Sequence, residues 1–441
     1  MDTNNLVIYN GTVMTVNPGF DIHRPGMVVI RDGGIVEVGP WAPGRPLPPA
    51  ARHIDAEGGI VMPGLVNTHT HLPMTLFRGL ADDLPLDQWL NGHIFPAEAR
   101  HINAEAVACG TRLAVAELLL GGTTCCCDGY FLAHQVAEAV EALGLRAVIG
   151  QGVVDFPAPG VPDPAGNVEA ARDFVNRWQN RSPRIHPAIF CHSPYTCGRD
   201  TLVRAKAAAR TAGCLFQIHV AETEAERRQS ITAHGLSPVA RLENLDIWDD
   251  RTLAVHAVWV DQGEIEILAR RRAAVSHNPQ SNMKLAAGVA PVPDFLDAGV
   301  TVGLGTDGCA SNNDLDLFGE MDTVAKLHKV QRLDPTVVDA ATVLRLATIE
   351  GARVLGLADR IGSLEPGKRA DLIVVDTRQP HLTPLYNPVS HLVYAARGAD
   401  VRHTVIDGRL VMRDRRLLTI DLETLLDEAR ARAALVASWV A

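Results

Sequence analysis

The feature that most constrains this chain is a series of eight apolar segments that alternate with helical stretches across its middle. The segments cover residues 60–71, 122–128, 146–155, 185–193, 215–222, 253–259, 273–278 and 300–307. Continuous apolar strands are typical of a parallel sheet that is buried on both faces. Eight strand–helix units in about 250 residues predict a (β/α)8 TIM-like barrel, within the α/β fold class.

Both ends of the chain show a different pattern, in which short alternating apolar runs are separated by Gly-rich turns. LVIYNGTVMTV lies near the N-terminus, and ADLIVVD and VRHTVIDGRLVMRDRR lie near the C-terminus. Such runs indicate short antiparallel strands, and the Asp-Gly pair in VIDGRLVM predicts a hairpin. We expect residues 1–59 and 366–420 to form a small β-sandwich domain, residues 60–365 the barrel, and residues 421–441 a C-terminal helix.

Composition narrows the classes of partner. The formal net charge of the 441 residues is −10, whereas nucleic-acid-binding proteins usually carry a basic face. No apolar run reaches the roughly 18 residues that cross a bilayer, and the first residues lack the pattern of a secretory signal. The eight cysteines have no paired spacing and indicate reduced thiols. We therefore expect a cytoplasmic protein that binds neither nucleic acid nor membrane.

Polar side chains gather where the predicted strands end. In a barrel of this kind the carboxyl ends of the strands form the working face. Six residues that can bind metal or transfer protons lie at these ends: His69 and His71 on strand 1, His219 and Glu222 on strand 5, His256 on strand 6, and Asp307 on strand 8. Residues two apart on a strand point the same way, so both histidines of strand 1 can face the barrel mouth.

Three histidines and one carboxylate form a ligand set that suits Zn²⁺, Fe²⁺ or a similar ion. His69, His71, His219 and Asp307 provide such a set. A bound ion would lower the pKa of a water molecule toward neutrality. Glu222 follows His219 by three residues and is suited to carry a proton near the metal.

Other motifs have simpler explanations. Gly303, Gly305 and Gly308 match a dinucleotide-binding pattern, but they follow a late strand and no acidic residue has the expected spacing. The three cysteines 125–127 cannot all face one metal, because successive strand residues point to opposite faces, so buried thiols are expected. A lone histidine such as His277 is more typical of a structural residue.

These motifs resemble the amidohydrolase superfamily over nearly the whole chain. They are PGLVNTHTH (63–71), HVAET (219–223), SHNPQSNMKL (276–285), GTDG (305–308) and GSLEPGKRADLIVVD (362–376). More narrowly, HLPMTLFRGLADDLPLDQWL (71–90) and DGCASNNDLDLFGEM (307–321) resemble the S-adenosylhomocysteine/5′-methylthioadenosine deaminase group. The resemblance implies hydrolytic deamination of an adenine nucleoside to the inosine analogue and ammonia.

The resemblance also implies one divalent metal per subunit, with zinc favoured and iron or manganese as alternatives. Binuclear members use a carboxylated lysine at the end of strand 4, where this chain reads IHPAIFCHSPYT and has no lysine. His69, His71, His219 and Asp307 would hold the ion. Glu222 would carry the water proton to a ring nitrogen, and His256 would orient the hydroxide. Glu222 or Asp307 would then help ammonia leave.

The resemblance assigns Trp89, Glu98 and His192 to the nucleoside. Glu98 would accept hydrogen bonds from the ribose hydroxyls, because a carboxylate is an acceptor only. Some members hold a homocysteine carboxylate with arginines after strand 3, but residues 150–167 contain no Arg or Lys. The substrates left open are 5′-methylthioadenosine, S-adenosylhomocysteine, adenosine and 5′-deoxyadenosine, and Arg172 or a neighbouring subunit could still supply the charge.

Two alternatives stay open. A deaminase or chlorohydrolase that acts on a free heterocycle, such as guanine, 8-oxoguanine, a pterin or an s-triazine, would use the same metal site. A metal-dependent binding or assembly protein without catalysis is disfavoured, since Glu222 and His256 are both present. The expected partners are a small-molecule nucleoside and further copies of the chain, in a homo-oligomer that is a dimer or tetramer.

Overall fold

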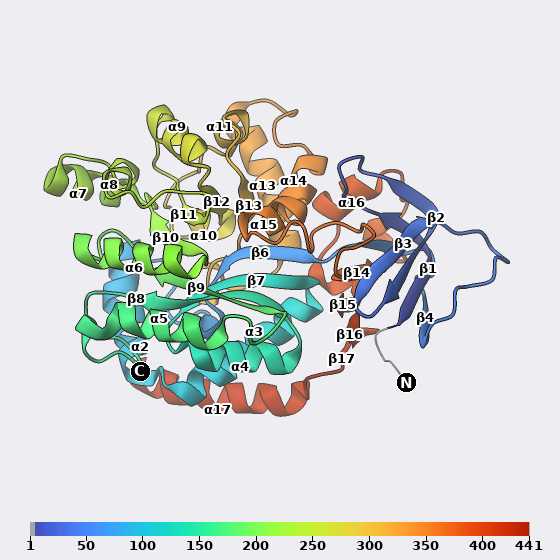
Figure 1. The fold of residues 1–441 in the computed structure, drawn as a ribbon, viewed down its shortest axis with the longest axis horizontal. Coiled ribbons are helices and arrows are strands. Elements are labelled where there is room, and N and C mark those ends of the chain that lie inside the picture. The colour runs from blue at the N-terminus through green and yellow to red at the C-terminus, as the bar shows by residue number, and fades with distance from the viewer. Residues whose placement is uncertain (1–4, 441) are drawn as a thin grey trace.

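The protein was analysed as a computed structural model that describes residues 5–440. Figure 1 shows a barrel beside a smaller sheet. The barrel strands are β6 (Leu65–Thr70), β7 (Thr123–Tyr130), β8 (Arg146–Val153), β9 (Ile185–Cys191), β10 (Phe216–Val220), β11 (Thr252–His256), β12 (Ala274–His277) and β13 (Val302–Leu304). Neighbouring strands pair in parallel in the order β6 to β13. The predicted α/β class with a (β/α)8 barrel is therefore confirmed.

The first and last barrel strands meet at the turn after β13. The backbone N–H of Asp307 donates to the carbonyl oxygen of His69 at 3.0 Å. Two glycines allow this close approach: a Cβ on Gly303 would lie 2.4 Å from the Thr68 side chain, and one on Gly305 would lie 2.3 Å from the amide oxygen of a neighbouring asparagine. The glycines that imitate a dinucleotide motif thus serve strand packing.

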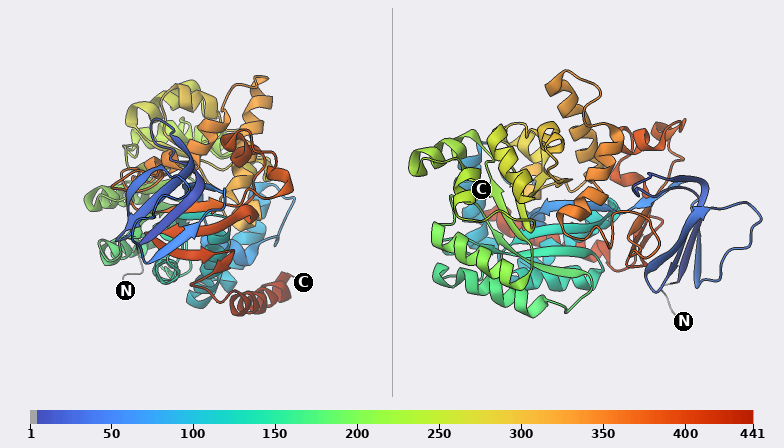
Figure 2. Two further views of the ribbon diagram at one scale, coloured as in Figure 1. Left: turned by 90° about the vertical axis from the view of Figure 1, so that its right-hand side faces the viewer. Right: turned by 45° about the horizontal axis from the view of Figure 1, so that its top comes forward.

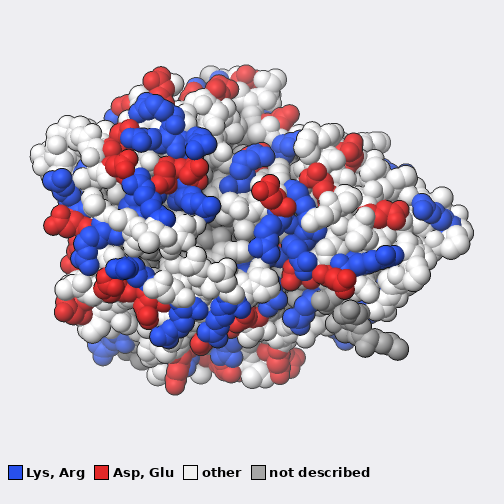
Figure 3. Space-filling view, viewed as in Figure 1, with Lys and Arg blue, Asp and Glu red and all other residues white. Residues whose placement is uncertain are grey.

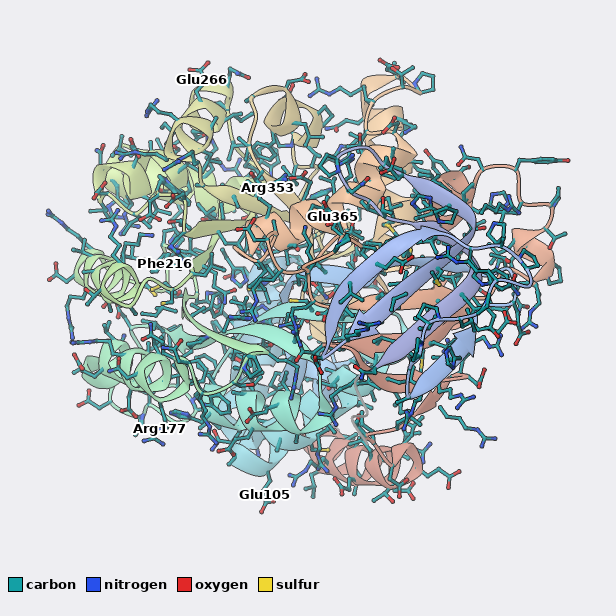
Figure 4. The ribbon with its side chains drawn as sticks, turned by 45° about the vertical axis from the view of Figure 1, so that its right-hand side comes forward. Glu105, Arg177, Phe216, Glu266, Arg353 and Glu365 are labelled. Atoms are coloured by element: carbon teal, nitrogen blue, oxygen red, sulfur yellow. The ribbon has the colours of Figure 1, made fainter. Side chains whose placement is uncertain are left out.

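Helices surround the barrel (Figures 1 and 2). The longer ones are α3 (Ala104–Leu120), α4 (Ala133–Leu143), α5 (Asn167–Trp178), α6 (Arg199–Ala212), α7 (Glu224–His234), α9 (Gln262–Arg271) and α13 (Leu317–Arg332). The shorter ones are α1 (Leu86–Trp89), α2 (Phe95–His101), α8 (Pro238–Asn244), α10 (Pro279–Lys284), α11 (Val292–Asp297), α12 (Cys309–Asn312), α14 (Ala340–Leu346), α15 (Ile349–Val354) and α16 (Pro388–Tyr394). Arg177 of α5 and Glu266 of α9 project outward into solvent, whereas Phe216 of β10 is buried (Figure 4).

Strands from both ends of the chain form one nine-stranded sheet, in which blue and red strands lie side by side (Figure 2). They are β1 (Leu6–Met14), β2 (Ile22–Arg31), β3 (Gly34–Pro40), β4 (Arg52–Asp55), β5 (Ile60–Pro63), β14 (Leu372–Val375), β15 (Val401–Ile406), β16 (Arg409–Arg413) and β17 (Arg416–Leu417). The two halves join where β5 pairs antiparallel with β14. The predicted hairpin turns at Asp407 and Gly408, whose φ angles of 53° and 73° suit a type I′ turn.

One predicted strand proves to be two. Residues 60–71 were expected to form a single barrel strand, but the chain leaves the small sheet at Pro63 and enters the barrel at Leu65. Gly64 lies between them, where an added Cβ would come within 2.1 Å of the Thr124 side chain. Both strands are buried throughout, so an unbroken apolar run gives no sign of the change from one sheet to the other.

A buried ion pair joins the amino end of the barrel to the small sheet. Arg146 begins β8, and its side chain has no exposed surface. Its Nε and Nη2 atoms donate to the two carboxylate oxygens of Asp371 at 2.7 and 3.1 Å. Nη2 also lies 3.4 Å from a carboxylate oxygen of Asp407, in the hairpin turn. This bidentate geometry fixes the small sheet against the barrel.

The C-terminal helix α17 (Leu422–Val440) lies against α3, to which it is tied by the ion pairs Arg112–Glu428 and Glu105–Arg432. Residue 441, expected in this helix, falls outside the described residues. Within residues 5–440, none of the helices combines the length and hydrophobicity needed to cross a membrane. Lys and Arg side chains are interspersed with Asp and Glu over the face in Figure 3.

Candidate metal centre and active site

The carboxyl ends of three barrel strands bring the predicted metal ligands His69, His71, His219 and Asp307 together, and a fourth strand adds His256, which was predicted to orient the hydroxide. The ligand atoms of His69, His219, His256 and Asp307 all lie within 4.8 Å of one another, and all four residues are buried. Nε2 of His71 lies 3.3 Å from Oδ1 of Asp307. His69 of β6 and His71, which follows that strand, therefore face the same cluster, and their ring centroids are 4.7 Å apart.

The protonation and orientation of these groups suit a cation. Burial lowers the pKa of His69 to about 4, and burial together with neighbouring histidines holds the pKa of His219 well below its usual value. The Nε2 atoms of these two rings face each other at 3.0 Å. Nδ1 of His71 lies 2.6 Å from the carbonyl oxygen of Gly129, and donation there leaves Nε2 free to bind. Neutral imidazoles converging on a carboxylate are the donors that a divalent metal requires, so the residues fit one.

Asp307 is held in a single orientation. Burial alone would raise the pKa of Asp307, but the surrounding histidines, with His69 first among them, keep it well below its usual value. Its Oδ2 atom accepts hydrogen bonds from the hydroxyls of Ser281 and Ser311 at 2.7 and 2.9 Å. The other oxygen, Oδ1, is the one directed at the histidines.

The backbone bends sharply where the strands deliver these side chains. Ala221, His256 and Asp307 have φ angles of 52°, 72° and 62°. Such angles are uncommon outside glycine and concentrate at functional sites. At the first bend, the N–H groups of Ala221 and Glu222 donate to the carboxylate of Glu226 at 2.9 and 2.8 Å. The carboxylate of Glu226 thereby fixes the turn that carries Glu222.

Glu222 lies beside the cluster with His256 as its neighbour. Its Oε2 atom is 3.9 Å from Nε2 of His256. Burial raises the pKa of Glu222; His256 opposes this shift and Asp307 adds to it. Nδ1 of His256 lies 2.9 Å from the amide oxygen of Asn282, and donation there leaves Nε2 facing Glu222. A carboxyl group with a raised pKa beside a fixed imidazole is suited to proton transfer.

Trp89 and Glu98 lie on one helical segment, in which a π-helical turn (Leu90–Ile94) connects α1 to α2. Both side chains are buried. The hydroxyl of Tyr130, at the end of β7, donates to Oε1 of Glu98 at 2.6 Å. Burial raises the pKa of Glu98 to about 7, against the effect of this hydrogen bond.

His192 follows β9 and lies against the metal cluster. Its ring centroid is 4.9 Å from that of His219, and its Nδ1 atom is 3.2 Å from the hydroxyl of Thr196. Burial lowers the pKa of His192 to about 3, so its ring is neutral. His277 instead faces His328 of α13, with 3.3 Å between their Nε2 atoms. The structure thus separates His277 from the metal cluster, in line with a structural role.

A cavity of about 980 Å³ lies outside the cluster. The cavity is large enough for a small organic ligand. It approaches the cluster at Thr223, the neighbour of Glu222, and at Thr196, the partner of His192. Its apolar wall is formed by Leu84, Leu86, Leu90, Phe95, Phe156 and Leu285. The cavity therefore lies beside residues that adjoin the metal cluster, and its apolar wall suits a planar ligand.

Five residues that the sequence did not predict hold the predicted ones in place. These are Tyr130, Glu226, Ser281, Asn282 and Ser311. Ser281 and Asn282 lie within the motif SHNPQSNMKL, so the polar residues after strand 7 were an available signal. Tyr130 gave none, because it bonds Glu98 across 32 residues of chain.

Comparisons with known proteins agree with this geometry. The Amidohydrolase family model matches residues 60–411. A 5-methylthioadenosine/S-adenosylhomocysteine deaminase of Syntrophobacter fumaroxidans is 51% identical over 96% of this chain and 97% of the relative. A 5′-deoxyadenosine deaminase of Methanosarcina acetivorans is 46% identical over 97% of each chain. An adenosine deaminase of Xanthomonas campestris, solved with bound zinc, has a TM-score of 0.96 and 40% identity over 98% of this chain and 99% of its own. This chain belongs to the amidohydrolase family.

Proposed function

We propose that the protein catalyses the metal-dependent hydrolytic deamination of an adenine nucleoside, which yields the inosine analogue and ammonia. The observation that carries this proposal is the buried Glu222 carboxyl group, which lies 3.9 Å from His256 of the metal cluster and precedes Thr223, a lining residue of a cavity of nucleoside size. Relatives that match over nearly their whole length are named as deaminases of 5-methylthioadenosine, S-adenosylhomocysteine and 5′-deoxyadenosine, which supports an adenine nucleoside as the substrate.

We assign the metal to His69, His71, His219 and Asp307, and we favour zinc, which the related adenosine deaminase binds. When bound, the ion would act as a Lewis acid that lowers the pKa of a water molecule. We give His256 the role of orienting that water, although its ligand atom also lies in the cluster. Its Nδ1 is occupied by an asparagine, and its Nε2 faces Glu222.

In the proposed reaction, Glu222 moves the protons. As water adds to C6 of adenine, Glu222 accepts the water proton and delivers it to ring nitrogen N1, which a carboxyl group with a raised pKa can do in both directions. Glu222 or Asp307 then assists the departure of ammonia. Trp89, Glu98 and His192 are proposed to hold the nucleoside, with Glu98 accepting hydrogen bonds from the ribose hydroxyls.

Substitution of Glu222→Gln tests this role. We expect the variant to keep its metal content and to lose about 10²- to 10⁴-fold in kcat for ammonia release, because general acid–base catalysis contributes on that scale. Glu224→Gln, an exposed change two residues away, is the matched control. Full activity in the Glu222 variant would contradict the mechanism. Turnover of guanine, a pterin or an s-triazine in place of every adenine nucleoside would contradict the substrate class.

We also propose that the enzyme works in the reducing cytoplasm and forms a homo-oligomer, either a dimer or a tetramer. All eight cysteines are free and all but Cys214 are buried, which suits a reducing compartment. Assembly is proposed because barrels of this kind often pair. Light scattering on the purified protein measures the number of subunits, and a monomer at every concentration would contradict it.

A further inference from the structure

The cavity outside the metal centre has a strong imbalance of charge. Four acidic residues line it, Asp83, Asp87, Asp155 and Glu226, whereas Lys284 is the one basic residue among its lining residues. The carboxylate of Glu226 accepts hydrogen bonds from two backbone N–H groups. The other three carboxylates determine what charge a ligand meets on its way to the metal.

Lys284 offers little positive charge to a ligand. Its Nζ atom lies 2.6 Å from a carboxylate oxygen of Asp82 and also donates to the side-chain oxygen of Asn313. Asp82 is outside the cavity lining. The positive charge of Lys284 is therefore paired with Asp82 and does not neutralise the acidic residues that face the cavity. A ligand anion would have to compete with Asp82 for it.

The acidic groups of the wall have neutral partners. Asp155 accepts hydrogen bonds from the backbone N–H of Gly198 at 2.6 Å and from the hydroxyl of Thr201 at 2.7 Å. Asp87 accepts from the side-chain amide of Asn91 at 2.7 Å. Such donors fix a carboxylate and leave its charge in place. Among the side chains that the structure describes, none forms an ion pair with Asp83, Asp87 or Asp155.

The proposed reaction sets which part of the substrate meets these charges. The adenine ring must bring C6 to the metal cluster, at the inner end of the site. The rest of the nucleoside, including the 5′ substituent of the ribose, then extends outward into the cavity. Leu86, Leu90, Phe95 and Phe156 provide apolar contacts there, and the three carboxylates line the same cavity.

We propose that this cavity selects nucleosides by the charge of the 5′ substituent, accepting neutral and cationic groups and rejecting anionic ones. The inference rests on the proposed function and names the substrate class within it. An anionic substituent would exchange its water shell for an apolar wall and carboxylates of the same sign, which disfavours binding. A methyl or methylthio group loses no polar solvation there, so 5′-deoxyadenosine and 5′-methylthioadenosine fit. The carboxylate of S-adenosylhomocysteine has no free cationic partner.

The experiment compares four substrates of the metal-loaded, full-length enzyme that differ at the 5′ position. They are 5′-amino-5′-deoxyadenosine (cationic), 5′-deoxyadenosine (neutral), 5′-O-sulfamoyladenosine (neutral) and adenosine 5′-monophosphate (anionic). The sulfamoyl compound matches the phosphate in size and so controls for steric exclusion. We expect kcat/KM for the monophosphate to be at least about tenfold below that for the sulfamoyl compound. The kcat/KM for the amino compound should equal or exceed that for 5′-deoxyadenosine.

Salt separates charge from shape. Raising the ionic strength from about 0.05 to about 0.5 M shortens the range of charge interactions, so kcat/KM should rise for the monophosphate and fall for the amino compound. The two neutral substrates should change little. A monophosphate value that stays low at every salt concentration would overturn electrostatic selection in favour of shape.

A charge-neutralising variant locates the effect. Asp83→Asn/Asp87→Asn removes two exposed carboxylates and should raise the monophosphate-to-sulfamoyl ratio of kcat/KM several-fold. Asp427→Asn on α17, outside the cavity lining, is the control and should leave the ratio unchanged. Equal kcat/KM for all four substrates would overturn the charge selection and leave the proposed function intact. Failure of all four to release ammonia would overturn both.

Discussion

The two ends of the barrel bury charge in opposite ways. At the amino end, Arg146 is fully paired within the chain, because Asp371 binds it through both oxygens and Asp407 lies beside it. At the carboxyl end, Asp307 is surrounded by histidines, and burial lowers the pKa of one of them, His69, to about 4. Neutral imidazoles do not balance a carboxylate. The amino end is complete by itself, whereas the carboxyl end needs an added cation.

The free-energy cost of burying a charge has a different consequence at each end of the barrel. Removing a charge from water costs several kcal/mol unless a partner compensates for it. Where the partner belongs to the chain, as at Asp371, the interaction orients the small sheet against the barrel. Around Asp307 the chain supplies metal-binding atoms but no positive charge. A bound metal cation would compensate for the buried carboxylate, and this contributes to the affinity for the metal. The following predictions test whether the two ends behave in these separate ways.

The largest effect on stability is expected at the amino end. Substitution of Arg146→Ala should lower the free energy of unfolding by about 3–5 kcal/mol, because it leaves the buried Asp371 carboxylate without its cationic partner. Urea unfolding followed by tryptophan fluorescence measures this change. Arg172→Ala, which breaks an exposed pair with Glu169, is the control and should cost less than about 1 kcal/mol. Equal losses in the two variants would show that Arg146 is not a special contact.

At the carboxyl end, stability should depend on metal. Zinc at about 100 times its dissociation constant should stabilise the protein by about 2.7 kcal/mol relative to the chelated form, because only the folded state assembles the ligands. Thermal melting with zinc and with a chelator measures this difference. His219→Ala should lose most of the response and Arg146→Ala should keep it. If the melting temperature of the parent protein is the same with zinc and with the chelator, the carboxyl end does not depend on metal and the contrast between the two ends is refuted.

A smaller effect is expected at the ribose end of the site. Tyr130→Phe removes the hydrogen bond to Glu98 and should raise KM for adenosine about tenfold while kcat stays near that of the parent, since a hydrogen bond to a charged group is worth about 1.5 kcal/mol or more. Steady-state kinetics with 2′,3′-dideoxyadenosine as the comparison substrate should show little change. Tyr386→Phe, at an exposed tyrosine, controls for the loss of a hydroxyl. If the variant raises KM equally for the dideoxy compound, Tyr130 does not act through the ribose.

The smallest predicted effect is a pH dependence of ribose binding. Because burial raises the pKa of Glu98 to about 7, the group is ionised above that pH and protonated below it. A protonated carboxyl accepts fewer hydrogen bonds, so KM for adenosine should rise about threefold as the pH falls from about 8 to about 6. Glu98→Gln should flatten this profile. The same slope in that variant would assign the titration to another group.

Much of the barrel could be predicted because its strands are short apolar runs that end in polar residues. All eight strands lie within the segments expected, apart from small differences at their ends. The exception is the first segment, which the chain divides at Gly64 between two sheets. Burial looks the same in either sheet, and the partner strand β14 lies more than 300 residues away, so no local pattern could show the division.

The candidate site could be predicted to the extent that its residues stand at strand ends. His69, His71, His219 and Asp307 carry the chemistry of a metal site in their residue types and in their order along the barrel. The contacts of His256 could not be predicted, since its distance to Glu222 depends on left-handed turns at Ala221 and at His256 itself. Alanine does not favour such a turn and histidine adopts it only uncommonly, so the folded barrel imposes both.

By itself the sequence determined which groups reach the mouth of the barrel, because alternation along a strand and the parallel order of strands follow from local pattern. Only the tertiary structure decided how those groups are held: the serines on Asp307, the asparagine on His256 and the tyrosine on Glu98. It also decided that four acidic residues line the cavity and that its one lysine is paired with Asp82. The physical reason is that charge balance and hydrogen bonding depend on which residues lie near one another in space. In each of these regions the neighbouring residues come from distant parts of the chain.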